Sequence, residues 1–156
     1  METTLTAMEQ YQVAEIELVY KSKVKASARP KVLTSRDVYE VFKQSWDENK
    51  IDFIEQFKIM LLNRSNRVLG IYEVSTGGIT GTVADPRIIF TAALKGNAVS
   101  IALAHNHPSG DIKPSRQDEA LTEKIKNAGL FLDIKVIDHV VISSESYFSF
   151  ADEGLL

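Results

Sequence analysis

The pattern of hydrophobic and polar positions along the chain predicts three helices in its body. Residues 35–49 carry apolar side chains at helical spacing, and Thr34 or Ser35 can cap the start of that helix. Pro86 is a residue type that often begins a helix, and a glycine follows each of the last two helical segments. We therefore expect helices over residues 35–49, 86–96 and 115–129.

Apolar runs of strand length alternate with these helices. Residues 57–78 hold two such runs joined by the polar segment 63–66, which predicts a β-hairpin. Residues 98–104 are almost entirely apolar, which indicates a strand buried on both faces, and residues 134–143 return to a strand pattern. The order helix, hairpin, helix, strand, helix, strand predicts an α/β domain with a mixed central sheet flanked by helices.

The first 31 residues differ from the rest, and we expect an N-terminal arm over residues 1–31 ahead of a domain over residues 32–156. Within the arm, residues 13–24 are rich in β-forming side chains and predict a strand. The segment 21–36 has six cations and no acid, which fits either a solvated edge strand protected by lysines or a surface that binds nucleic acid. The six cations are Lys21, Lys23, Lys25, Arg29, Lys31 and Arg36.

Composition limits the class of protein further. The chain has 156 residues and 44% apolar side chains, enough for one buried core. Cysteine is absent, which excludes disulfides, thiolate nucleophiles and zinc sites with sulfur ligands. The formal net charge of -3 argues against a broad basic face. The sequence has no membrane-length apolar run and no secretory signal pattern, so we expect a cytoplasmic protein without membrane contact.

Two of the three histidines follow the apolar run 98–104. The side chains of His105 and His107 leave the chain on the same side if the extended conformation persists through Asn106. Asp118 lies in the first turn of the next predicted helix, and the loop between is long enough to bring it back over the strand end. Two imidazoles and one carboxylate form the ligand set of a catalytic zinc site, which leaves a fourth position for water.

The same residue types also occur in different roles. Ser115 and Asp118 form the S-x-x-D pattern of a helix cap, although capping and metal binding are compatible. An iron oxygenase also uses two histidines and one carboxylate, so the ligand set alone does not exclude iron. A zinc deaminase is excluded, because it needs cysteine ligands that the chain lacks.

The spacing H-x-H, seven residues, S, two residues, D resembles the signature of the JAMM/MPN metalloprotease family, and HNHPSG and PSRQD resemble its bacterial RadC branch. The resemblance extends over residues 32–156. It implies an MPN fold, layered like that of cytidine deaminases, and one zinc ion held by His105, His107 and Asp118. It also implies that Ser115 supports the reacting oxygen.

The resemblance further implies a glutamate outside this motif that acts as the general base. Our candidate is Glu73 on the second strand of the predicted hairpin, although Glu73 also fits a surface residue of an edge strand. Asp111 is a candidate for supporting or replacing a ligand. Asp138 and His139 are expected to be a polar pair at a strand end or to support the ligands.

The resemblance implies a zinc-dependent hydrolase of the JAMM type that uses activated water to cleave a peptide or isopeptide bond, whereas the site residues by themselves predict only metal-activated water. In this reaction zinc and Ser115 would stabilise the oxyanion and Glu73 would transfer the proton. A second hypothesis follows from the association of the RadC name with DNA repair, and it predicts a nuclease or a nucleic-acid accessory protein. The short arm lacks the helix-hairpin-helix region of longer relatives, which argues against autonomous DNA binding. A third hypothesis is a non-catalytic MPN scaffold.

Overall fold

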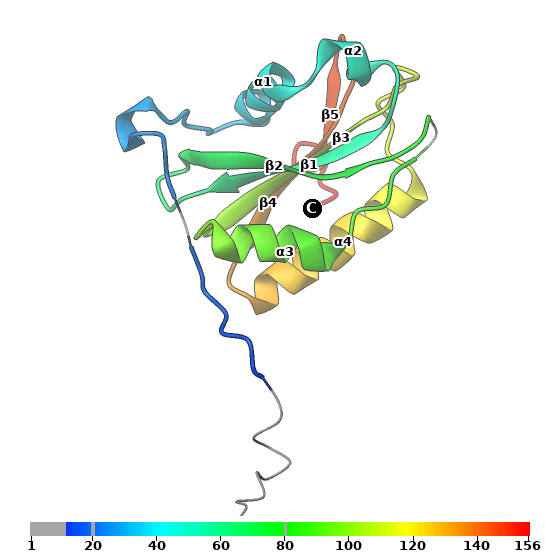
Figure 1. The fold of residues 1–156 in the computed structure, drawn as a ribbon. Helices are drawn as coiled ribbons and strands as arrows, with labels where there is room; N and C mark the ends of the chain where they lie inside the picture. Colours follow the sequence, from blue (N-terminus) through cyan, green and yellow to red (C-terminus); the bar gives the residue numbers. More distant parts are fainter. Residues whose placement is uncertain (1–11, 20, 80) are drawn as a thin grey trace, which may run out of the picture.

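The structure is a computed structural model that describes residues 12–19, 21–79 and 81–156. Its body is a mixed sheet in the strand order β2-β1-β3-β4-β5 with helices on both faces, which confirms the predicted α/β class (Figure 1). The strands are β1 (Gln56–Leu62), β2 (Val68–Thr76), β3 (Ser100–Asn106), β4 (Lys135–Ile142) and β5 (Tyr147–Ser149). The helices are α1 (Ser35–Ser45), α2 (Glu48–Ile51), α3 (Pro86–Lys95) and α4 (Arg116–Phe131), with a short 3-10 helix at Ala26–Ala28.

The pairing of β1 with β3 decides which side chains meet at the edge of the sheet. β3 is antiparallel to β1 and parallel to β4, and α4 makes the crossover between the two parallel strands. Phe57, near the start of β1, pairs with His105, near the end of β3. The residues that precede β1 therefore lie beside the residues that follow β3.

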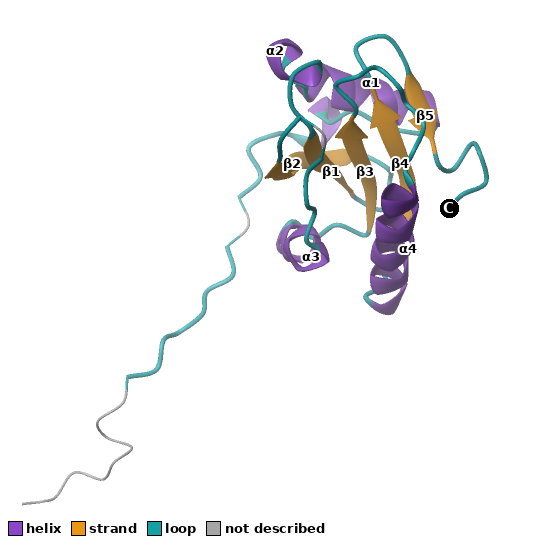
Figure 2. Cartoon of the chain, turned by 90° about the vertical axis from the view of Figure 1, so that its right-hand side faces the viewer, coloured by secondary structure: helices purple, strands orange, loops and turns teal. Residues whose placement is uncertain are grey.

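Two hydrophobic layers hold the sheet between the helices (Figure 2). Every residue of β1 and β3 is buried, as expected for central strands covered on both faces. On one face Phe42 of α1 packs with Met60, and on the other face Ile89 of α3 and Ile125 of α4 pack with Leu103. These side chains are 0% exposed, so each contributes the full burial of a large apolar group, roughly 2–3 kcal/mol.

Some element boundaries differ from the sequence prediction. The first helix ends at Ser45 and not near residue 49, because Asp47 caps the separate short helix α2 by accepting the backbone N–H of Asn49. Strand β3 continues through Asn106, so His105 belongs to the strand and not to the following loop. The short strand β5 was not predicted; it pairs with β4 over only three positions.

The predicted strand over residues 13–24 is wrong for the part of the arm that the structure describes. Residues 12–19 and 21–24 belong to no strand, and their side chains are exposed. Only Lys31, at the end of the arm, makes an isolated antiparallel bridge, with Arg67. β-forming side chains stabilise a strand only when a partner strand supplies hydrogen bonds, and here the arm leads away from the body (Figure 1).

Among the described residues, no helix is both long enough and apolar enough to cross a membrane.

Candidate metal centre

The end of β3 brings two imidazoles to one edge of the sheet. The backbone N–H of His107 donates to Ile142 O at 3.0 Å, which continues the ladder with β4 beyond Asn106. The chain therefore stays extended from His105 to His107, and both side chains leave on the same side. Their Nε2 atoms are 3.0 Å apart.

Asp118 reaches the same point from the start of α4. Its Oδ2 lies 3.3 Å from His105 Nε2 and 3.5 Å from His107 Nε2. The same oxygen accepts the backbone N–H of Ser115 at 2.8 Å, while Ser115 Oγ accepts the backbone N–H of Asp118 at 3.1 Å. Asp118 therefore completes a capping box and faces both imidazoles with one oxygen.

These three side chains fit a tetrahedral metal ion. Zinc binds imidazole nitrogen and carboxylate oxygen at about 2.0–2.1 Å, so tetrahedral ligand atoms stand about 3.3 Å apart. The observed separations of 3.0, 3.3 and 3.5 Å span that value. Where both Nε2 atoms carry a lone pair, the two lone pairs repel one another at 3.0 Å, and a cation between them would remove that repulsion.

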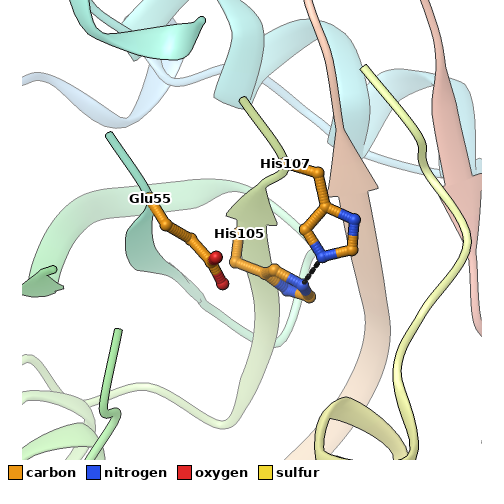
Figure 3. Close-up of side chains that lie close together, drawn as sticks. All are labelled: Glu55, His105 and His107. Atoms are coloured by element: carbon orange, nitrogen blue, oxygen red, sulfur yellow. Dashed lines mark hydrogen bonds between the residues drawn. The ribbon is translucent and has the colours of Figure 1, made fainter. Parts of the chain in front are cut away.

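Glu55 lies beside His105 and His107, and the sequence analysis did not predict it as a site residue. One carboxylate oxygen of Glu55 and one ring nitrogen each of His105 and His107 lie within 4.8 Å of one another (Figure 3). Glu55 directly precedes β1, and its backbone pairs with Gly77 and Gly78 after β2. Its side chain is partly buried, and this burial raises the pKa of its carboxyl while His105 and His107 oppose the rise.

Asn106 anchors the segment that carries Glu55. This side chain is 0% exposed, and its Oδ1 accepts the backbone N–H of Gln56 at 2.7 Å. Its Nδ2 donates to the carbonyls of Ile51 and Ile54, each at 2.8 Å. The residue between the two imidazoles therefore fixes the position of the glutamate that faces them.

Glu73 lies elsewhere. In the ladder between β1 and β2 it pairs with Lys58, whose ammonium reaches Ser45 O at 3.1 Å at the end of α1. The imidazole of His105 points to the opposite face of the sheet, the face of Leu103, where α3 and α4 pack. Glu73 is exposed and hydrogen-bonds the side chain of Gln56. The prediction that Glu73 lies beside His105 and His107 is corrected: Glu55 occupies that position.

The electrostatics of the cluster follow from its contacts. Burial alone would raise the pKa of Asp118, but hydrogen bonds to His105 and His107 hold it well below its usual range. The hydrogen bond to Asp118 raises the pKa of His107 despite the opposing effect of burial. The carboxylate therefore stays ionised and available to a cation.

Each imidazole has a partner on its other nitrogen. His107 Nδ1 lies 2.6 Å from the backbone carbonyl of Asp111, in a loop where Gly110 has φ 86°. A carbonyl oxygen only accepts, so Nδ1 of His107 carries a hydrogen, and in the neutral ring Nε2 then keeps its lone pair. Asp111 thus contacts His107 through its backbone carbonyl and not through its carboxylate. His105 Nδ1 lies 2.8 Å from Nε2 of the buried His139.

The side chains of Asp138 and His139 form hydrogen bonds with different partners. Asp138 Oδ2 accepts the hydroxyl of Ser149 at 2.7 Å, and Oδ1 accepts the backbone N–H groups of His139 and Ala151. The two residues are not a pair of contacting side chains. Of the two, His139 is the residue whose side chain contacts His105.

A groove of about 420 Å³ opens beside the cluster. His107, Ser115, Asp118 and Glu55 line it together with Thr82 and Leu121. The Ser115 hydroxyl accepts the N–H of Asp118, which leaves its hydrogen free to donate into the groove. The predicted position of Ser115 beside the ligands therefore agrees with the geometry.

The predicted cations of the arm are placed as follows. Lys21, Lys23, Lys25 and Lys31 are exposed, and Arg36 forms an exposed ion pair with Glu40 at 3.0 Å. The sixth cation, Arg29, is partly buried and donates to Ser22 Oγ at 2.6 Å.

Fold and site together define an α/β domain with a cluster of metal-ligand residue types at the end of a central strand. The family model of the RadC-like JAB domain matches residues 32–155. Among curated relatives, a UPF0758 protein of Flavobacterium johnsoniae is 40% identical over 125 residues, covering 80% of this chain and 53% of that protein. A UPF0758 protein of Porphyromonas gingivalis is 44% identical over 103 residues, covering 65% of this chain and 45% of that protein.

The chain belongs to the RadC-like JAB domain family. It spans about half the length of the curated relatives that it matches.

Proposed function

We propose that this chain is a zinc-dependent hydrolase of the JAMM type that cleaves a peptide or isopeptide bond with water. The observation that carries the proposal is the convergence of His105 Nε2, His107 Nε2 and Asp118 Oδ2 at separations of 3.0–3.5 Å. Three protein ligands leave one tetrahedral position open, as in catalytic zinc sites. When bound, zinc supplies Lewis-acid activation that makes water nucleophilic near neutral pH.

Glu55 is the group that we assign to proton transfer. It stands beside the imidazoles without joining the tight triad, which suits a base that must reach a water molecule. Burial raises the pKa of its carboxyl, which brings the acid closer to the range in which it can both accept and return a proton.

Ser115 and the groove would position the substrate. The free hydrogen of the Ser115 hydroxyl can stabilise negative charge that develops on a carbonyl oxygen. Apolar side chains such as Leu121 and polar side chains such as Thr82 both line the groove beside His107 and Asp118.

Metal binding is tested first. Purified protein should bind one zinc ion per chain, measured by mass spectrometry of metals and by titration calorimetry. The His107→Ala variant should lose that binding, and Glu73→Gln, on the other face of the sheet, should keep it. Absence of zinc binding at micromolar concentration in the wild-type chain would overturn the proposal.

Activity is tested by a substrate screen. Fluorogenic peptides, isopeptide-linked conjugates and phosphodiesters are incubated with the zinc-loaded protein, with and without a chelator. Peptide or isopeptide cleavage that the chelator stops and added zinc restores is the expected result. Cleavage confined to phosphodiesters would instead support the nucleic-acid hypothesis.

A further inference from the structure

A buried chain of hydrogen bonds runs from the metal ligands into the core. It begins at His105 Nδ1, which lies 2.8 Å from His139 Nε2. It continues from His139 Nδ1 to Thr122 Oγ1 at 2.6 Å, and from the Thr122 hydroxyl to the backbone carbonyl of Asp118 at 2.6 Å. All three side chains are at most 1% exposed, so water does not compete for these contacts.

The direction of each bond follows from its neighbour. Thr122 has one hydroxyl hydrogen, which it donates to the carbonyl of Asp118, so toward His139 its oxygen accepts. His139 Nδ1 must then carry a hydrogen. A neutral imidazole carries only one, so His139 Nε2 is an acceptor and His105 Nδ1 must donate to it. This leaves the lone pair of His105 on Nε2, the atom that faces His107 and Asp118.

His139 is held in a setting that favours its neutral form. Its ring stacks on Phe150 at a centroid distance of 4.7 Å and meets the edge of Phe57 at 5.5 Å. The neighbouring carboxylate of Asp138 binds Ser149 and backbone N–H groups and not the His139 ring. A buried imidazole that contacts no carboxylate is costly to charge.

We propose that Thr122 and His139 are positioning residues that fix the tautomer of His105 so that its Nε2 can bind the metal ion. The inference rests on the proposed function, because Thr122 and His139 would position a ligand of the proposed zinc site. A comparison with His107 shows why His105 needs residues that fix its tautomer. A backbone carbonyl fixes the tautomer of His107, whereas the neighbour of His105 is another imidazole, which can accept or donate.

Loss of the Thr122 hydroxyl should reverse the direction of the hydrogen bond between His139 and His105. Without an acceptor, a hydrogen on His139 Nδ1 is buried and unpaired, so His139 changes to the tautomer with hydrogen on Nε2. That hydrogen meets His105 Nδ1, and His105 must then carry its own hydrogen on Nε2, where the metal would bind. The Thr122→Val variant is nearly isosteric and removes only the hydroxyl.

The test is zinc affinity measured by competition with a chelator, in the full chain. Thr122→Val should weaken zinc binding about tenfold to hundredfold, the usual effect of losing a partner of a ligating histidine. Thr122→Ser should restore it. Thr91→Val is the matched control, because Thr91 makes the same hydroxyl contact to a helix carbonyl, Arg87 O at 2.7 Å, but contacts no histidine. Thr122→Ala is the second variant if the valine variant does not fold.

Nitrogen-15 NMR of the histidine rings gives a readout independent of affinity. Hydrogen on Nδ1 of both His105 and His139 is expected in the zinc-loaded wild type, and hydrogen on Nε2 of His139 in zinc-free Thr122→Val. Zinc affinity of Thr122→Val within twofold of wild type would overturn the inference alone. A wild-type chain that binds no zinc would overturn the proposed function and this inference with it.

Discussion

Glu55 and Glu73 lie on opposite faces of the same sheet, and only Glu55 shares the face of the imidazoles. Glu55→Gln should therefore reduce hydrolysis by about a hundredfold to ten-thousandfold, the usual contribution of a general base. Zinc stoichiometry should stay unchanged, because the triad of ligands is intact. Glu73→Gln is the matched control, and we expect it to keep wild-type turnover. A loss of turnover in Glu73→Gln with retention in Glu55→Gln would reverse the assignment.

Asp118 offers a way to separate helix capping from metal binding. Asp118→Asn keeps an oxygen that can accept the backbone N–H of Ser115 but removes the charge, so zinc affinity should fall while the helix cap is retained. Asp118→Ala removes both functions and should also cost about 0.5–2 kcal/mol of stability. Equal zinc affinity of Asp118→Asn and wild type would show that Asp118 is not a ligand. Denaturant unfolding and zinc titration provide the two measurements.

Asn106 should be more important for stability than its polar character suggests. Asn106→Ala removes the partners of one backbone N–H and two carbonyls near Glu55, and we expect a loss of about 2–4 kcal/mol. Urea unfolding of the zinc-free chain measures this loss. Asn127→Ala, which loses one contact to Glu123 at 3.4 Å on the exposed face of α4, should change stability little. Comparable losses in both variants would contradict the anchoring of Glu55 by Asn106.

The first turn of α1 predicts a dependence of stability on acid. Hydrogen bonds from the backbone N–H groups of Leu33 and Thr34 lower the pKa of Asp37 below its ordinary value of 3.8. The unfolded chain therefore binds the proton first as the pH falls. The stability that Asp37 contributes is fully present above pH 3.8 and is lost as the pH falls through its lower folded value.

Thermal unfolding of wild type and Asp37→Asn between pH 2 and pH 7 measures this effect. The difference in melting temperature between the two proteins should be largest near neutral pH and should shrink in acid. Glu40→Gln, on the same helix, removes a carboxylate that does not cap the backbone. A constant difference across the pH range would contradict the contribution of the Asp37 carboxylate.

The sequence predicted those parts of the site that are close together in the chain. His105 and His107 follow one strand and Asp118 begins the next helix, so strand geometry and a helix cap were enough to bring them together. Glu55 lies 50 residues before His105 and meets it only because β1 and β3 are antiparallel neighbours. Hydrophobic periodicity identifies strands but does not assign their order in a sheet.

The strands predicted incorrectly were those whose formation depends on a neighbouring strand. The run 13–24 has strand-forming side chains but no strand beside it in the described residues, and the three-residue β5 forms only because β4 offers a free edge. The break after Ser45 could have been predicted from Asp47, a capping residue type placed inside an apparently continuous helix.

The support of His107 by a backbone carbonyl has a consequence for sequence variation. Asp111 contacts the imidazole through its main chain, while its carboxylate accepts the backbone N–H of Lys113 at 3.0 Å and helps to hold the loop. Gly110, with φ 86°, would instead be strained by almost any side chain, and this strain would move the carbonyl that follows it. Natural variants should therefore resist change at position 110, although glycine has no side chain that could contact the imidazole.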